Sequence, residues 1–143
     1  MDNLFGDAVF MRYALNALPS IVLVTDEDVR ILFRNTAASE LLKGEKIYGD
    51  RVGNVMHCLY AANDAGGCGR GAACADCVLR NAVGKAFSGK AVRRRRTDLS
   101  IKTGGKTRAI PALVSASAFT FEEKLYALVV IEDISELVEL RSL

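Results

Sequence analysis

The sequence has 143 residues, a length that suits one domain and leaves little room for a second. Half of the residues are hydrophobic, 25% are charged and the formal net charge is +2. This is ordinary globular composition, and the charge is too small to argue for a nucleic-acid partner. His57 is the only histidine, so a histidine-based catalytic pair has one place to form.

The N-terminus does not have the pattern of a signal peptide, because acidic residues stand where basic ones would precede an apolar run. No apolar stretch approaches the roughly 20 residues of a membrane-spanning helix. We therefore expect a cytoplasmic protein that does not bind membranes. In that compartment its four cysteines are expected to be thiols or metal ligands rather than disulfides.

The first segment, residues 1–18, predicts an amphipathic helix that ends before Pro19. Apolar residues recur at steps of four and three, the spacing of a dimerising helical stripe. The stripe consists of Leu4, Ala8, Met11, Leu15 and Leu18. We expect this helix to pack on its own domain or on a second copy of the chain, as a homodimer.

Five strands are expected, at residues 21–26, 29–35, 91–103, 106–119 and 125–132. The first is rich in β-branched residues, and it forms a hairpin with the second around the turn Glu27-Asp28. Gly104-Gly105 has the composition of a two-residue hairpin turn, and residues 120–124 are expected to form a loop.

Helices are expected between the two groups of strands. Asn35-Thr36 caps a short helix at 37–42, and a longer helix runs from Val78 to Ser88. A last helix begins at Ile134, where Ser135 can cap it. The order predicts an α+β domain with a five-stranded antiparallel sheet and helices on one face.

All four cysteines lie in one glycine-rich segment with the spacing C-x9-C-x5-C-x2-C: Cys58, Cys68, Cys74 and Cys77. Four thiolates could hold one zinc ion or one iron–sulfur cluster. Cys74 and Cys77 stand at the predicted start of a helix, whose N–H groups would lower their thiol pKa values. Metal-free redox thiols and purely structural cysteines are the alternatives, and His57 is a candidate fifth ligand.

A thiol oxidoreductase is disfavoured because the thioredoxin-like βαβ context is absent, so we expect no enzyme activity.

The strongest charge run is Arg93 to Arg96. On a strand, two of these arginines would face each side of the sheet. We expect a solvated strand end, with a site for an anionic partner as the alternative. No nucleic-acid motif accompanies the run.

Three stretches resemble the PAS domain family. Ala17–Asp26 looks like the family's opening strand, Ile31–Ala38 like its second strand with the following helix, and Val129–Glu136 like its last strand and exit. The resemblance covers about residues 16–135. It implies the PAS fold for residues 19–133 and the start of a signalling helix at residues 134–143.

The resemblance also implies a sensory domain of a bacterial signal-transduction protein, such as a two-component system. The effector, for example a histidine kinase, would lie outside this chain, and the signal would leave through Asp133, Ile134 and Ser135. A PAS pocket lies between the sheet and the longer helix, and no flavin or haem is expected in this one. Its expected lining is aliphatic: Val22, Val24, Leu32, Leu79, Val83, Val114, Val129 and Ile131.

The four-cysteine loop resembles that of PAS sensors holding oxygen-labile iron–sulfur clusters, although its spacing is not that of two separated C-x2-C pairs. The resemblance implies that the chain senses redox state or oxygen through such a cluster. The alternative is a ligand-binding or dimerisation module whose cysteines bind zinc or only shape the loop.

Overall fold

A five-stranded antiparallel sheet forms the body of the structure, a computed structural model that describes residues 6–44 and 47–142. The strands lie in the order β2-β1-β5-β4-β3, so that the first and last strands of the chain are central neighbours. The predicted α+β class and five-stranded sheet are confirmed. The strands are β1 Ile21–Thr25, β2 Ile31–Arg34, β3 Val92–Thr103, β4 Lys106–Phe121 and β5 Lys124–Asp133.

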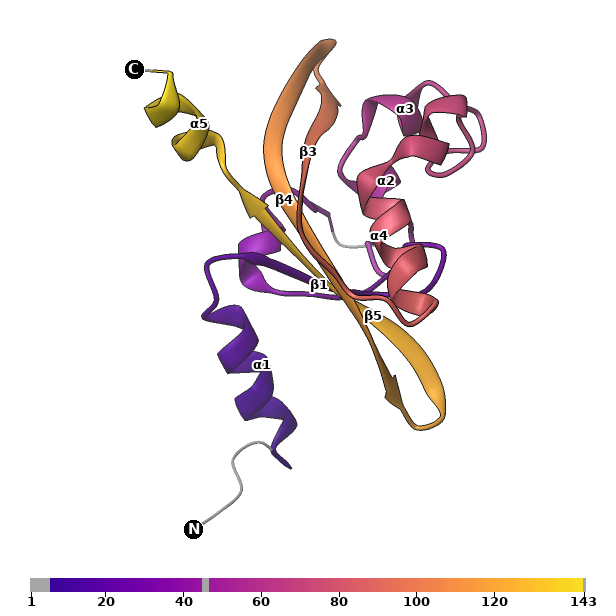
Figure 1. The fold of residues 1–143 in the computed structure, drawn as a ribbon, viewed down its shortest axis with the longest axis vertical. Helices are drawn as coiled ribbons and strands as arrows, with labels where there is room; N and C mark the ends of the chain where they lie inside the picture. Colours follow the sequence, from indigo (N-terminus) through magenta and orange to yellow (C-terminus); the bar gives the residue numbers. More distant parts are fainter. Residues whose placement is uncertain (1–5, 45–46, 143) are drawn as a thin grey trace.

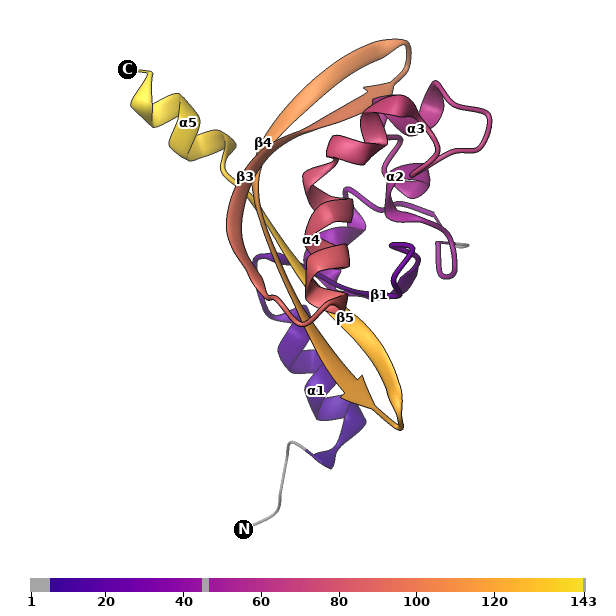
Figure 2. The same cartoon turned by 45° about the vertical axis from the view of Figure 1, so that its right-hand side comes forward.

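The helices α2, α3 and α4 lie together against one face of the sheet, whereas α5 leaves on the opposite side (Figures 1 and 2). No helix in the described residues is both long and apolar enough to cross a membrane. The helical elements are α1 Ala8–Asn16, η2 Thr36–Ser39, α2 Val52–Val55, α3 Leu59–Ala62, η3 Ala72–Asp76, α4 Val78–Phe87 and α5 Ser135–Arg141, where η marks a 3₁₀ helix.

The core lies between α4 and the inner face of the sheet. Alternate residues of β4 and β5 are buried because successive side chains on a strand point to opposite faces. On α4 the buried residues recur at helical spacing: Leu79, Ala82, Val83 and Ala86. Leu23 and Ile31, both 0% exposed, extend this core under β1 and β2.

The two hairpin connections on the long strands are both two-residue turns. Gly104 and Gly105 have φ values of 56° and 80°, which confirms the predicted turn. The predicted loop at 120–124 is wrong, because pairing continues to Phe121 and Lys124 and leaves only Glu122 and Glu123 in the turn. These two glutamates adopt φ values of 50° and 65°.

The β1–β2 connection is longer than the predicted Glu27-Asp28 turn. Val29 has a φ of 60° and is 1% exposed, so the chain turns into the core here and β2 begins only at Ile31. Asp26 Oδ1 accepts hydrogen bonds from the amides of Asp28 and Arg30, both at 2.9 Å. We call residues 26–30 the β1–β2 turn.

Asn35 does not cap a helix, contrary to the sequence prediction. Its buried side chain accepts a hydrogen bond from Val22 N at 3.0 Å and donates to Leu15 O at 3.1 Å and Ser20 O at 2.9 Å. The amide is therefore used to join α1 and β1, and the expected helix at 37–42 is only the short η2.

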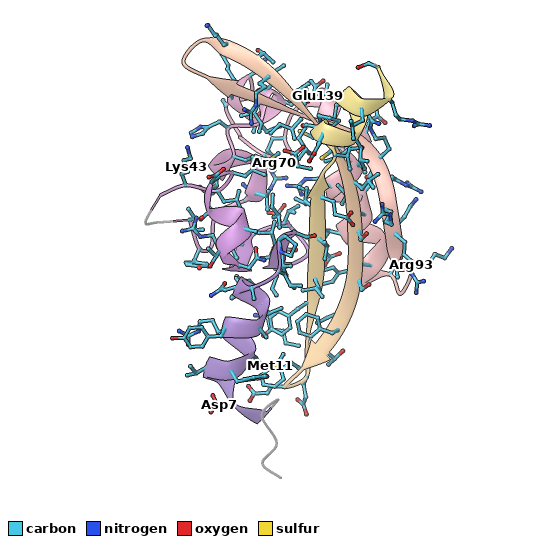
Figure 3. All side chains as sticks on the ribbon, turned by 90° about the vertical axis from the view of Figure 1, so that its left-hand side faces the viewer. Asp7, Met11, Lys43, Arg70, Arg93 and Glu139 are labelled. Carbon is cyan, nitrogen blue, oxygen red and sulfur yellow. The ribbon has the colours of Figure 1, made fainter. Side chains whose placement is uncertain are left out.

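The arginine run does not alternate regularly across the sheet as predicted. Arg94 has a φ of 48° and the pairing of β3 with β4 shifts between Val92 and Arg95, which marks a β-bulge. Arg94 Nη1 lies 3.0 Å from Glu132 Oε2, while Arg93 points away from the edge of the sheet (Figure 3).

Candidate functional site: a cavity lined by four cysteines

All four cysteines line one cavity of about 320 Å³. Its other walls come from α3, the first turn of α4 and residues 97–100 of β3. The four side chains are free thiols. The fold thus brings together four residues that the sequence placed in one segment but could not place in space.

Each cysteine is held by a different local structure. Cys58 donates its amide to Gly53 O at 2.9 Å and forms an isolated β-bridge with Ile101. Cys74 lies in η3 and is 8% exposed. Cys77 ends η3 and is the residue before the first turn of α4. The cavity is therefore built where three short helical segments meet β3.

Cys68 lies in a loop whose shape depends on two glycines. Gly67 and Gly69 have φ values of 78° and 85°, a left-handed conformation that side chains disfavour. Between them, the amide of Cys68 donates to Asn54 Oδ1 at 2.8 Å. Asn54 in turn donates to Asp50 Oδ1 at 2.9 Å, which ties this loop to α2.

Gly53 provides the space into which two of the cysteines fit. A Cβ atom on Gly53 would lie 2.8 Å from Cys68 Sγ and 3.5 Å from Cys58 Cβ. The first distance is shorter than van der Waals contact, so only glycine leaves the sulfur in place. Gly53 lies in α2, where alanine would be the better helix former, so the requirement is for space.

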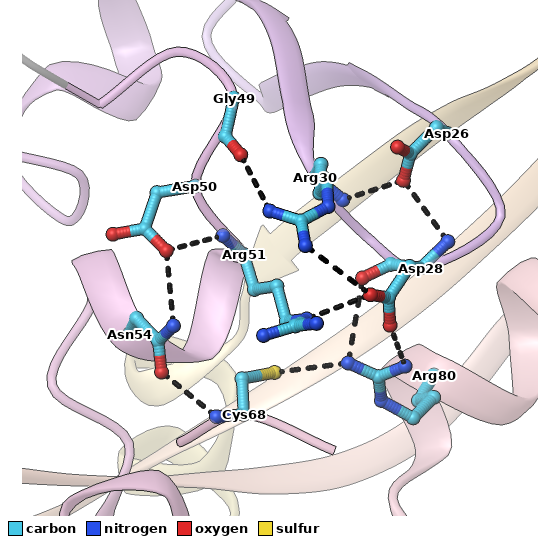
Figure 4. Close-up of polar contacts among 9 residues, drawn as sticks. All are labelled: Asp26, Asp28, Arg30, Gly49, Asp50, Arg51, Asn54, Cys68 and Arg80. Carbon is cyan, nitrogen blue, oxygen red and sulfur yellow. Dashed lines mark hydrogen bonds and ion pairs between the residues drawn. The ribbon is translucent and has the colours of Figure 1, made fainter. Parts of the chain in front are cut away.

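An ion-pair cluster connects this cavity to the β1–β2 turn (Figure 4). Arg80 on α4 donates from Nη2 to Cys68 Sγ at 3.3 Å and from Nη1 to Asp28 Oδ1 at 2.8 Å. Arg51 Nε donates to the other oxygen of Asp28, also at 2.8 Å. Arg30 lies farther from the same carboxylate, at 3.8 Å. One carboxylate is thus shared by three guanidinium groups.

The pKa values of the two central residues reflect this pairing. Partial burial alone would raise the pKa of Asp28, but the hydrogen bonds and charges of Arg80 and Arg51 outweigh it and hold that pKa below the ordinary 3.8. Burial alone would lower the pKa of Arg80, whereas Asp28 and Cys68 raise it. Asp28 and Arg80 are therefore both charged at neutral pH.

The predicted lowering of the thiol pKa at the helix start is wrong for Cys77. Burial raises the pKa of this thiol above its ordinary value of 9.0. The backbone N–H groups of Arg80 and Leu79 oppose the rise, as the helix argument requires, but do not cancel it. The nearby sulfurs of Cys58 and Cys68 raise it further, because like charges repel.

The donor set of the cavity fits zinc or an iron–sulfur cluster in its chemistry, since both take four thiolates. The sulfurs are not already arranged as a coordination shell. In residues 6–44 and 47–142, no three His, Cys, Asp or Glu side chains are grouped so that they could hold a metal ion.

His57, the candidate fifth ligand, is not among the residues that line the cavity. Its backbone has a φ of 59° and its side chain is exposed. The carbonyl of His57 accepts a hydrogen bond from Lys102 N at 2.8 Å, which joins this residue to β3 through the backbone. The structure therefore does not support His57 as a ligand.

The predicted aliphatic pocket is partly wrong. Val22 and Val24 pair with Val130 and Leu128, on the sheet face opposite to that of Leu23. Leu32 is 41% exposed and lies at the register shift between β1 and β2, next to the buried Ile31. The other predicted lining residues do lie together, as members of the packed core: Leu79, Val83, Val114, Val129 and Ile131.

A second, wider groove of about 570 Å³ lies near the end of β5. It includes Asp133, the first of the predicted exit residues, together with Lys43 and Arg108.

Ser135 does not cap α5 as predicted. Instead, Asp133 Oδ1 accepts hydrogen bonds from the Ser135 amide at 2.9 Å and hydroxyl at 2.6 Å, which orients the helix where it leaves the sheet.

The predicted dimerisation helix is shorter than expected. Leu4 lies outside the described residues, and α1 ends before Leu18. Asp7 caps the helix by accepting from the amides of Val9 and Phe10. No residue of α1 is fully buried; of its stripe, Ala8 is exposed, whereas Met11 and Leu15 are partly covered by this domain.

The residues that hold the cavity together were not predicted. Arg80 follows Cys77 by three residues, one helical turn, which is the single sequence signal that could have identified it. Asp28 is 52 residues from Arg80 and has no signal in the sequence. Gly53 and Asn54 lie in a segment for which the sequence predicted no helix or strand.

No protein-family model matches the chain, and no curated protein matches it. Among solved structures, it is similar to the PAS domain of nitrogen regulation protein NR(II) from Vibrio parahaemolyticus, with 19% identity, 87% of this chain and 97% of that chain covered, and a TM-score of 0.58. It is also similar to the PAS domain of an HTR-like protein from Haloarcula marismortui, with 20% identity and a TM-score of 0.54; the match covers 89% of this chain and 96% of that chain.

A PAS domain from a two-component sensor histidine kinase is a third similar structure, with 10% identity, 87% of this chain and 94% of that chain covered, and a TM-score of 0.56. The sheet order, the helices on one face and these similarities show that the chain has the PAS fold. The predicted fold is therefore confirmed.

Proposed function

We propose that this chain is a sensory module that receives its signal at the cysteine cavity, as a change in the redox or metal state of the four thiols. The observation that carries the proposal is the position of Cys58, Cys68, Cys74 and Cys77 around one cavity. A packed PAS core does not need such a feature. Similar folds in a nitrogen regulation protein and a sensor histidine kinase support a role in signal transduction.

The four thiols would hold an iron–sulfur cluster, and zinc is the competing metal. A cluster in this cavity would supply one-electron chemistry that responds to oxygen. The chain's own contribution is to gather the sulfurs around the cavity. Gly53 leaves space for Cys68, and Arg80 donates a hydrogen bond to its sulfur while the thiol is free.

Anaerobic purification with iron, sulfide and zinc analysis and a visible spectrum tests this proposal. We expect a brown protein that contains iron and sulfide and that bleaches in air. The variant with all four cysteines replaced by serine should contain neither. A colourless protein with one zinc per chain would contradict the iron–sulfur proposal, and a chain without either metal would leave redox thiols as the sensing groups.

The output would pass through α5 to an effector such as a histidine kinase, with the domain working as a homodimer through α1. The absence of fully buried residues in α1 supports this assembly. Met11→Lys should convert a dimer to a monomer in sedimentation experiments, whereas Tyr13→Lys, on the opposite side of the helix, should not. A wild-type monomer at all concentrations would contradict it.

A ligand-binding or dimerisation module with zinc-bound or structural cysteines is the second candidate. It is favoured by the groove of about 570 Å³ that reaches Asp133 beside the exit helix. Under this alternative, the four-serine variant keeps its dimer and its signalling. Loss of signalling in a folded four-serine variant would contradict it.

A further inference from the structure

Arg80 contacts the cysteine cavity and the β1–β2 turn with the same guanidinium group. Nη2 lies 3.3 Å from Cys68 Sγ and 3.4 Å from Asp28 O, and Nη1 lies 2.8 Å from Asp28 Oδ1. The side chains of Arg80 and Asp28 are 22% and 34% exposed, so water screens their pairing only in part. A change at the sulfur of Cys68 therefore affects the Arg80 guanidinium, which also holds Asp28 in the β1–β2 turn.

Two glycines, which have no side chain, leave the space that the sulfur of Cys68 and the guanidinium of Arg80 occupy. A Cβ atom on Gly69 would lie 2.4 Å from Arg80 Cζ, so the guanidinium lies directly against this glycine. On the other side of Cys68, a Cβ atom on Gly53 would lie 2.8 Å from Sγ. A substituent on this sulfur therefore has to extend into the cavity, which Arg80 also lines, and there it competes with the guanidinium that contacts the sulfur.

The β1–β2 turn is connected to the predicted exit of the signal. The amides of Asp28 and Arg30 are bonded to Asp26 Oδ1, and the amide of Val29 is bonded to Asp26 O, so the turn is closed. β1 leads directly into this turn, and β1 is paired with β5 along its whole length. Since β5 leads into α5, a displaced turn can shift the strand from which the exit helix leaves.

We propose that Arg80 is a positioning residue that transmits the state of the Cys68 sulfur to the β1–β2 turn. While the thiol is free, the guanidinium holds the sulfur and Asp28 together. When the sulfur is bound or covalently blocked, the guanidinium is displaced and the turn opens. The proposal rests on the proposed function only in taking the cysteine cavity as the place where the signal arrives.

Hydrogen exchange of the full 143-residue chain, before and after thiol blocking, tests this proposal. Methyl methanethiosulfonate is the reagent; it transfers a methylthio group to each thiol with release of methanesulfinate. We expect exchange in a peptide spanning residues 26–31 to become about fivefold to tenfold faster on blocking, because charge-assisted hydrogen bonds are lost. Mass spectrometry of the same sample reports whether Cys68 has been modified.

Three variants separate transmission through Arg80 from general loosening. In Cys68→Ser the other thiols are still blocked, and exchange in the turn should not respond. In Arg80→Gln exchange should be fast before blocking and unchanged by it. Arg51→Gln is the matched control, since Arg51 contacts the same carboxylate at the same 2.8 Å and, among the residues that the structure describes, forms no hydrogen bond with Cys68; this variant should keep the response.

Two results would overturn the proposal: a turn that does not respond although Cys68 is modified, or a response in Arg80→Gln as large as in the wild type. Should Arg80→Gln not fold, Arg80→Lys keeps the charge beside Asp28 but cannot bridge to the sulfur, and it should also lack the response. No metal enters this experiment. A chain that binds neither iron nor zinc would therefore contradict the iron–sulfur proposal without affecting this one.

Discussion

The sheet and the cysteine segment, residues 58–77, are stabilised in different ways. In the sheet, backbone ladders and buried aliphatic side chains hold every strand, and Leu23, Val114 and Val129 are 0% exposed. In the cysteine segment only Ala61 and Cys74 are buried. Its shape depends instead on glycines and on polar side chains that reach it from α2 and α4.

This difference indicates that the sheet is the stable part of the domain and that the cysteine segment is the adjustable part. Apolar burial is non-directional and tolerates small shifts, so the sheet keeps its structure while its neighbours move. Hydrogen bonds to a loop are directional, and a few of them can be broken without unfolding the domain. A change at the cysteines is thus expected to rearrange the loop and its contacts before it disturbs the core.

The largest effect is expected from the core. Leu23→Ala should lower the free energy of unfolding by about 2–5 kcal/mol, because it leaves a cavity at a fully buried position. Leu32→Ala, in the neighbouring strand but 41% exposed, should cost about 0.5 kcal/mol or less. Urea unfolding followed by circular dichroism measures both, and equal losses would contradict the assigned faces of the sheet.

A smaller effect is expected where α2 meets the cysteines. Gly53→Ala should cost about 1–3 kcal/mol, because the new methyl group would displace the sulfur of Cys68. Gly84→Ala is the matched control in α4, where a Cβ would meet nothing within 4 Å; this variant should gain roughly 0.5–1 kcal/mol from helix propensity. If both variants were stabilised, Gly53 would not be there to make room for the thiol.

The ion-pair cluster should contribute less again. Asp28→Asn should lower the free energy of unfolding by about 1–2 kcal/mol, since two guanidinium groups lose a charged acceptor in a partly exposed site. Asp98→Asn breaks a pair whose side chains are 53% and 60% exposed, and should cost less than about 0.5 kcal/mol. A loss for Asp28→Asn no larger than for Asp98→Asn would mean that the cluster does not hold the turn.

The smallest expected effect is a pH dependence of that same contribution. The folded-state pKa of Asp28 is below its ordinary 3.8, so the stabilisation is complete above that pH and is lost as the pH falls through the lowered folded-state value. The difference in unfolding midpoint between wild type and Asp28→Asn should therefore be constant near neutral pH and shrink in acid. A difference that persists unchanged in strong acid would contradict the charged pairing.

The sequence by itself determined the features that depend on short-range patterns. The apolar strands predicted the five-stranded sheet, and Gly104-Gly105 predicted a turn that the structure confirms. The clustering of the cysteines identified the segment that lines the cavity. These predictions succeeded because β-branched runs, turn glycines and cysteine spacing act locally, whatever the rest of the chain does.

Only the tertiary structure decided which side chains meet. Leu32 is exposed at a register shift between β1 and β2, and burial reversed the expected pKa change of Cys77. The pairing of Asp28 with Arg80 joins residues 52 positions apart, and no local pattern encodes it. Contacts of this kind depend on how α4 packs on the sheet, and that packing is fixed by the whole core at once.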